Sequence, residues 1–236
     1  MTDADVETSS PAYARRFEGR VGRWFLDVQA RTTLELLRPR TGTSVLDVGG
    51  GHGQLTAPLV AAGCEVTVYG SAESCSERVR EWVRSGRARF RSGPLLQAPW
   101  PDASFDAVLA FRLLPHVERW GELVAELCRL ARQVVIVDYP TARSANAVSG
   151  ALFGIKKGIE GDPRPFRVFR DAEVEDAFAA GGFVRTARRP QFLLPMALHR
   201  GLRLASLSRA IESTARAAGL TRSWGSPVIL RAERRA

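Results

Sequence analysis

Cysteine, lysine and long hydrophobic runs are scarce in this chain. Its 236 residues contain three cysteines and no CxxC pair, which excludes a disulfide framework and a cysteine-rich zinc site. No apolar run approaches the ~18 residues of a membrane span. Residues 1–10 are acidic and polar, lack the apolar stretch of a signal peptide, and are predicted to form a loose tail. We therefore predict a reduced, cytoplasmic protein with no metal and no membrane span.

Positive charge is plentiful, but almost all of it comes from arginine. The formal net charge is +9, and the only lysines are Lys156 and Lys157. A strongly basic chain can bind nucleic acid. Here the arginines are scattered along the chain and form no single stripe. We interpret the charge as compositional bias, which argues against a nucleic-acid partner.

Hydrophobic residues make up 45% of the chain, which predicts a folded protein with a full core. Predicted strands and helices alternate along it, as in a parallel, doubly wound α/β sheet. The strands are predicted at residues 44–48, 65–69, 89–91, 105–111, 133–139, 183–188 and 227–231. The helices are predicted near residues 13–37, 55–62, 71–85, 123–130, 171–180 and 198–218. The length favours one domain over residues 1–236.

A glycine-rich turn, VLDVGGGHG at residues 45–53, follows the first predicted strand. In such sheets, ligands bind beyond the carboxyl ends of the strands, and glycines let the backbone come close to them. A dinucleotide fingerprint requires G-x-G-x-x-G, but its third glycine would fall at Gln54. The spacing is instead G-x-G-x-G, with Asp47 two residues ahead of the first glycine.

This pattern resembles motif I of the class I S-adenosylmethionine (SAM)-dependent methyltransferases. The segment QAPWPDASFDAVLAFRLLPHV, residues 97–117, is similar to the region around that family's fourth strand. The order of elements also matches from about residue 13 to residue 188. The resemblance implies a Rossmann-like, mostly parallel seven-stranded sheet with helices on both faces. It also implies that the last strand, PVILR, is reversed.

The resemblance implies SAM as cofactor and assigns positions to it. Those around the glycine turn are Asp47, Gly49, Gly50, Gly51 and Gly53; further along the chain they are Gly70, Ser71, Leu95 and Phe111, with Tyr13 as a lid tyrosine. The family usually has an acid after the second strand that holds the ribose hydroxyls. Gly70 stands at that position here, and either Glu73 reaches back or it is merely a solvated acid of the following helix. Pro94 likewise replaces the usual acid near the adenine.

Methyl transfer is an in-line displacement at an activated sulfonium, so alignment matters most, and a base is needed only for a protonated acceptor. His116 is the candidate catalytic base, although a structural role is the favoured interpretation. His52 is expected to line the cofactor pocket, and His199 to face either a substrate or the surface. Aromatic rings near the sulfonium would help by cation–π attraction.

Three segments are expected to form substrate lids: residues 11–38, 141–170 and 195–220. The mixture of apolar and cationic residues in the last two segments predicts a small, hydrophobic acceptor with an anionic group near Arg164, Arg167 or Arg200. These two segments could also only finish the core or form a homodimer face. We therefore predict a small-molecule SAM-dependent methyltransferase. The alternatives are a non-catalytic SAM-fold binding module and, with less support, an RNA methyltransferase.

Overall fold

The computed structural model describes residues 4–144, 166–202 and 204–235, which build one seven-stranded sheet. The strands are β1 (Ser44–Val48), β2 (Glu65–Gly70), β3 (Ala88–Ser92), β4 (Phe105–Ala110), β5 (Ala131–Tyr139), β6 (Phe183–Phe192) and β7 (Ser226–Arg234). Their order across the sheet is β3-β2-β1-β4-β5-β7-β6. Strands β1 to β5 pair in parallel, whereas β7 runs antiparallel to both β5 and β6. The predicted α/β class and the reversed last strand are confirmed.

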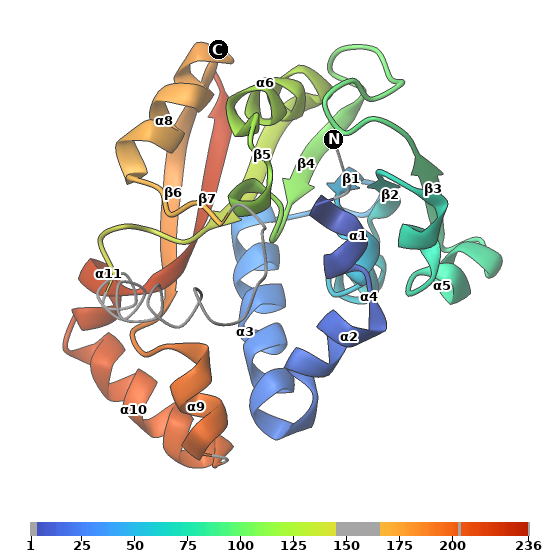
Figure 1. The fold of residues 1–236 in the computed structure, drawn as a ribbon. Helices are drawn as coiled ribbons and strands as arrows, with labels where there is room; N and C mark the ends of the chain where they lie inside the picture. The colour runs from blue at the N-terminus through green and yellow to red at the C-terminus, as the bar shows by residue number, and fades with distance from the viewer. Residues whose placement is uncertain (1–3, 145–165, 203, 236) are drawn as a thin grey trace.

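Helices cover both faces of the sheet (Figure 1). Helices α6 (Trp120–Leu130) and α8 (Asp171–Ala180) pack their apolar sides on one face, and α3 (Gly19–Leu37) and α4 (Thr56–Ala61) pack on the other. The central strands are buried from both sides, which explains why their sequences are apolar runs without alternation. The two cores lie back to back across β1, β4 and β5.

The first predicted helix is interrupted more than its periodicity indicates. Residues 11–37 form α2 (Pro11–Ala14), a 3₁₀ turn (Arg15–Phe17) and then α3, which starts at Gly19 with φ +76°. Gly22 does not break the helix; it lies where a Cβ would come within 2.2 Å of the Phe17 carbonyl oxygen.

Two other helices are also shorter than predicted. Residues 71–85 form only a 3₁₀ turn (Glu73–Ser76) and α5 (Arg80–Arg84). The late helix is split into α9 (Met196–Leu202) and α10 (Ala205–Ala217), followed by α11 (Leu220–Trp224). These helices form the excursion that connects β6 to β7 and lies below the sheet in Figure 1.

The prediction of a loose N-terminal tail is wrong for residues 4–9. Residues Ala4–Thr8 form helix α1, and the side chain of Asp5 is completely buried. Figure 1 shows α1 beside the ends of β1 and β2, far from α9 and α10. Across the described ranges, no helix has the length and apolar character needed to cross a membrane.

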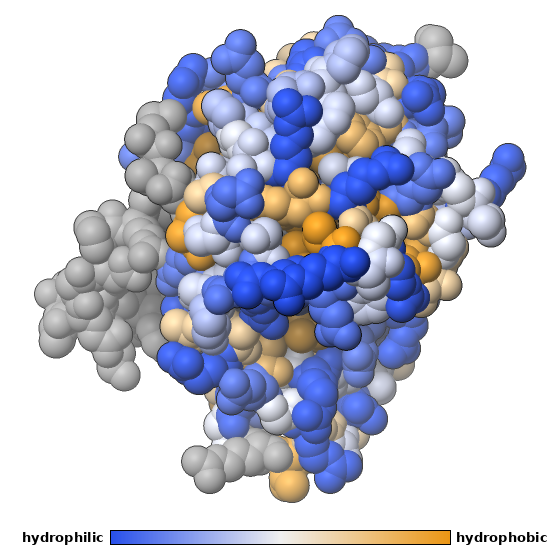
Figure 2. All heavy atoms as spheres, turned by 90° about the vertical axis from the view of Figure 1, so that its right-hand side faces the viewer, coloured by the Kyte–Doolittle hydropathy of each residue, from blue (hydrophilic) through white to orange (hydrophobic). Residues whose placement is uncertain are grey.

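The surface beyond β3 and α5 is mostly hydrophilic, with a hydrophobic strip exposed across its middle (Figure 2). Trp82, Val83 and Phe90 of these two elements are only partly buried against the core. On the excursion, Leu204 and Leu207 are 57% and 43% exposed, so neither completes the core.

Candidate active site

The glycine turn joins β1 to a 3₁₀ turn (Gly50–His52) at the carboxyl edge of the sheet. Gly49 and Gly53 have φ values of +71° and +70°, a conformation that side chains disfavour. A Cβ at Gly50 would lie 2.2 Å from the Asp47 Cγ. The backbone thus passes directly over the Asp47 carboxyl, and only glycine permits this path.

Asp47 is completely buried, and neither of its carboxyl oxygens has a hydrogen-bond partner in the described structure. Burial raises its pKa from 3.8 to about 7. Buried polar groups are nearly always paired, since an unpaired one costs free energy. The carboxyl at the end of β1 therefore has free acceptor capacity where ligands bind in this class of sheet.

His52 sits in the same turn and is also buried. Its Nδ1 accepts a hydrogen bond from the Gln54 backbone N–H at 3.2 Å. Burial, together with the positive charges of Arg112 and Arg78, lowers the pKa of His52 to about 3. His52 is therefore neutral and helps to shape the turn; it is poorly suited to accept a proton.

At Gly70, the end of β2, there is no room for the acidic side chain that the class I methyltransferases usually have at this position. A Cβ there would lie 2.6 Å from the Cβ of Cys75. Glu73, the alternative acid, accepts a hydrogen bond from the Ser92 hydroxyl at 2.8 Å and is thus held toward β3.

An acid does lie beside Gly70, but the N-terminal helix supplies it. The Asp5 carboxylate accepts hydrogen bonds from the Ser71 backbone N–H at 2.8 Å and from the Ser71 hydroxyl at 2.5 Å. The Cys75 thiol also lies within 3.5 Å of it. Sequence reasoning missed Asp5 because no pattern marks the polar N-terminal segment as ordered.

A second polar cluster occupies the carboxyl ends of β4 and β5. Asp138 accepts a hydrogen bond from the Arg112 backbone N–H at 2.5 Å and another from the Gln29 side-chain amide at 3.3 Å. Arg112 in turn donates to the Gln29 side-chain oxygen at 3.1 Å. Burial raises the pKa of Asp138 to about 6, although the Arg112 N–H and guanidinium oppose that shift. Arg112 has φ +57°, a conformation uncommon for a non-glycine residue.

Aromatic residues of α2 and the following turn cover this cluster. The Arg112 guanidinium lies 3.9 Å from the centre of the Phe17 ring and 5.8 Å from that of Tyr13. The Arg16 guanidinium also lies over Tyr13, at 4.9 Å. The ring of the predicted lid tyrosine is therefore in contact with arginines. The signal that could have revealed the cluster is the acid that ends the apolar strand QVVIVDY.

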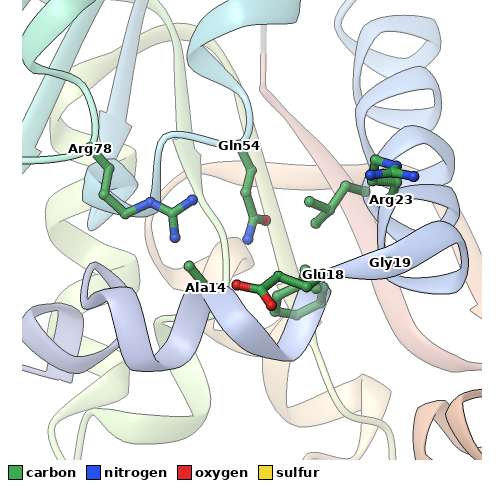
Figure 3. Close-up of a pocket in the computed structure, with 8 residues that line it drawn as sticks. Ala14, Glu18, Gly19, Arg23, Gln54 and Arg78 are labelled. Atoms are coloured by element: carbon green, nitrogen blue, oxygen red, sulfur yellow. The ribbon is translucent and has the colours of Figure 1, made fainter.

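A cleft of about 310 Å³ opens next to Phe17, between the start of α3 and the glycine turn. Figure 3 shows Arg78 and Gln54 projecting from one side of it toward Ala14 and Glu18 on the other side. Arg23 lies on its α3 side. The cleft is therefore lined by acidic and basic side chains and by one aromatic ring.

Other predicted site residues lie farther into the core or toward the edge. Phe111 is 1% exposed and packs inside the core, and Leu95 is partly buried against the opposite core. The His116 ring packs against Phe166 at 5.7 Å. Most of the predicted lid 141–170, including Arg164, lies outside the described residues, and Arg167 is paired with Glu173 at 3.3 Å.

His199 is fully buried, so the prediction that it faces a substrate or the surface is wrong. Its Nε2 lies 2.9 Å from a carboxylate oxygen of Glu212, and Trp24, Phe25 and Phe192 pack around its ring. Glu212 also accepts the backbone N–H groups that follow β6, those of residues 193 and 194. Two predicted lids, residues 11–38 and 195–220, thus meet through this buried pair and an apolar cluster.

Comparison with known proteins identifies the family. A family model described as a methyltransferase domain matches residues 46–136, which include the glycine turn and β4. Residues 46–136 thus carry a methyltransferase domain. The cofactor of this family is SAM. Both the family and the cofactor predicted from the glycine turn are confirmed.

Relatives of this methyltransferase act on different acceptors. An O-methyltransferase of Pyrenophora dematioidea is 30% identical over 111 residues, which cover 43% of this chain and 41% of that protein. The ubiquinone/menaquinone biosynthesis C-methyltransferase of Azotobacter vinelandii is 24% identical over 200 residues, 73% of this chain and 78% of that protein. The chain thus spans less than half the length of the first relative.

The fold is that of solved methyltransferases. Magnesium protoporphyrin IX methyltransferase from Synechocystis, whose structure holds bound S-adenosylhomocysteine (SAH), superposes with a TM-score of 0.65 at 18% identity. The match covers 94% of this chain and 92% of that one.

The residue types at the glycine turn fit SAM. The unpartnered Asp47 carboxyl can accept hydrogen bonds from an ammonium group. At residues 49–51, neighbouring atoms already take up the space that a side chain would need. Asp5 of α1 and Ser9, which follows α1, lie against this turn.

Proposed function

We propose that the chain transfers the methyl group of SAM to a small organic acceptor held at the carboxyl ends of β4 and β5. The observation that carries this proposal is the buried Asp47 carboxyl, which has no partner inside the described protein and lies under the glycine turn. SAM supplies an activated methyl on a sulfonium, so the protein has only to align the acceptor and exclude water.

In this proposal Asp47 and the backbone of residues 49–53 hold the methionine end of the cofactor. An ammonium group beside Asp47 would favour its ionised form, because an opposite charge stabilises the carboxylate. Binding near pH 7 would then release a proton from Asp47, whose pKa is about 7 without a ligand.

The acceptor is proposed to lie in the cleft beside Phe17, next to the Arg112–Asp138–Gln29 cluster that the rings of Tyr13 and Phe17 cover. The rings supply apolar contact area, and Arg112 has one buried guanidinium nitrogen without a partner in the described structure. That nitrogen fits an acceptor with an apolar body and an anionic or carbonyl group. Arg78, which lines this cleft, adds positive charge beside it.

The names of the relatives support a small-molecule acceptor and leave the acceptor atom open. One relative is named for O-methylation and another for C-methylation. A magnesium porphyrin is the named substrate of the solved neighbour. We propose that residues 11–38 and 195–220 select the acceptor, since they form the part of the site that lies outside the sheet.

The test is a calorimetric titration with SAH, with NADH as the comparison ligand. We expect micromolar binding of SAH and no binding of NADH. Near pH 7 the binding enthalpy should depend on the ionisation heat of the buffer, because a proton is released, and this dependence should disappear in Asp47→Asn. The same variant should bind SAH at least tenfold more weakly, a loss of about 1.4 kcal/mol. Equal affinity of wild type and Asp47→Asn would overturn the assignment of Asp47.

A further inference from the structure

Helix α1 lies directly against the glycine turn. A Cβ built at Gly51 would lie 2.3 Å from the Ser9 hydroxyl oxygen, and one built at Gly49 would lie 3.5 Å from the Asp5 Cβ. Asp5 and Ser9 are four residues apart and so face the same side of one helical turn. They are 0% and 3% exposed, respectively. The N-terminal segment therefore shares the space over the first and third positions of the glycine turn with Leu113 and Cys75.

Polar contacts of Asp5 hold α1 against the end of β2. The Asp5 carboxylate receives the Ser71 N–H and hydroxyl, and the Cys75 thiol lies 3.5 Å away. No ion pair of Asp5 occurs within the described residues. A helix of five residues is not stable by itself, so α1 is ordered only while these contacts last.

From this geometry we infer that α1 is an internal competitor for the cofactor cleft and must leave before SAM can bind. The inference rests on the proposed function, because it takes the cleft over the glycine turn as the cofactor site. While the cleft holds no cofactor, Asp5 accepts hydrogen bonds from the donors at the end of β2. It lies beside Gly70, the position at which the family usually has its ribose-binding acid. The apparent affinity for SAM is then reduced by the fraction of molecules in which α1 is docked.

The experiment compares three variants of the full chain with wild type by SAH calorimetry. Asp5→Ala removes the docking carboxylate, and deletion of residues 1–9 removes the whole segment. Glu7→Gln is the matched control, because Glu7 lies on the same helix but faces Arg16, at 3.6 Å. If α1 is docked in about 90% of molecules, Asp5→Ala and the deletion should bind SAH about tenfold more tightly. Glu7→Gln should match wild type.

A second readout separates competition from a purely structural role. Asp5→Ala should lower the melting temperature of the free protein while it raises the affinity for SAH. Saturating SAH should also speed hydrogen exchange at the Ser9 and Ser10 amides, which are bonded to the carbonyls of residues 5 and 7 in the docked state. A structural contact alone would give lower stability with no gain in affinity and no faster exchange.

Three results would overturn the inference. Weaker SAH binding by Asp5→Ala would mean that Asp5 is a cofactor ligand and not a competitor. Unchanged affinity in both Asp5→Ala and the deletion would mean that α1 does not exclude SAH, and the proposed function would stand. Absence of SAH binding in every variant, the deletion included, would overturn the proposed function together with this inference.

Discussion

Two buried acids, Asp47 on β1 and Asp138 on β5, lie near the carboxyl ends of parallel strands of one sheet, yet they differ in their hydrogen-bond partners. Asp138 accepts hydrogen bonds from Arg112 and Gln29, whereas Asp47 accepts none within the described structure. Burial raises both pKa values, to about 6 for Asp138 and to about 7 for Asp47. The Asp138 carboxylate is satisfied inside the protein, whereas the Asp47 carboxyl is left for an external partner.

The largest expected effect concerns the unpartnered acid. In the folded state the pKa of Asp47 is above its unfolded value of 3.8, so the folded protein binds the extra proton. The contribution of Asp47 to the free energy of unfolding is therefore most favourable below about pH 4 and is lost as the pH rises through 7. We expect Asp47→Asn to raise the free energy of unfolding at pH 8 by roughly 2–4 kcal/mol and to change it little near pH 4. Urea unfolding at both pH values checks this.

A control of opposite sign is available on β4. Asp106 accepts hydrogen bonds from the Ser44 backbone and hydroxyl, and the first of these is the main cause of its lowered pKa. Asp106→Asn should therefore lower stability at pH 8. If both variants changed stability in the same direction, the contrast between unpartnered and partnered acids would be wrong.

The partnered acid should behave as a structural group. Asp138→Ala leaves the Arg112 N–H and the Gln29 amide without their acceptor, and we expect it to lower the free energy of unfolding by about 1–3 kcal/mol. Asp138→Asn keeps a carbonyl oxygen and should cost less. Thermal unfolding of both variants measures the difference, and a larger loss in the Asn variant would contradict the hydrogen-bond account.

A smaller effect is expected at the tight edge beyond β2. Gly70→Ala places a Cβ 2.6 Å from the Cβ of Cys75, and this overpacking should lower stability by about 1–2 kcal/mol. Gly121→Ala, in α6, meets no atom within 4 Å and should instead raise stability by about 0.5–1 kcal/mol. A stabilising Gly70→Ala would mean that the edge can open to hold an acid.

The smallest effect is expected for Glu73. Because it is bonded to Ser92 and points toward β3, Glu73→Gln should change the affinity for SAH less than about twofold. A tenfold loss in calorimetry would restore Glu73 as the ribose acid and would place a second acid beside Asp47 in the cofactor half of the site.

The sequence was sufficient to predict the sheet because its strands are buried on both faces and appear as apolar runs, as in QVVIVDY. The glycine turn was recognisable because Gly49 and Gly53 need positive φ and so restrict the residue type. By contrast, Asp5 acts through Ser71, 66 residues away, and Gln29 through Asp138, 109 residues away. Such partners leave no local period or spacing, so only the folded structure brings them together.

Glu212 has a consequence for how the acceptor site can evolve. One carboxylate joins the end of β6, His199 of α9 and its own helix α10, so the excursion between β6 and β7 holds itself together. Its two ends are anchored by the antiparallel pairing of β6 with β7, which does not involve the strands of the cofactor half. In the proposed function, residues 195–220 select the acceptor, so insertions, deletions and sequence drift within residues 195–224 would alter which acceptor binds while leaving the glycine turn and Asp47 unchanged.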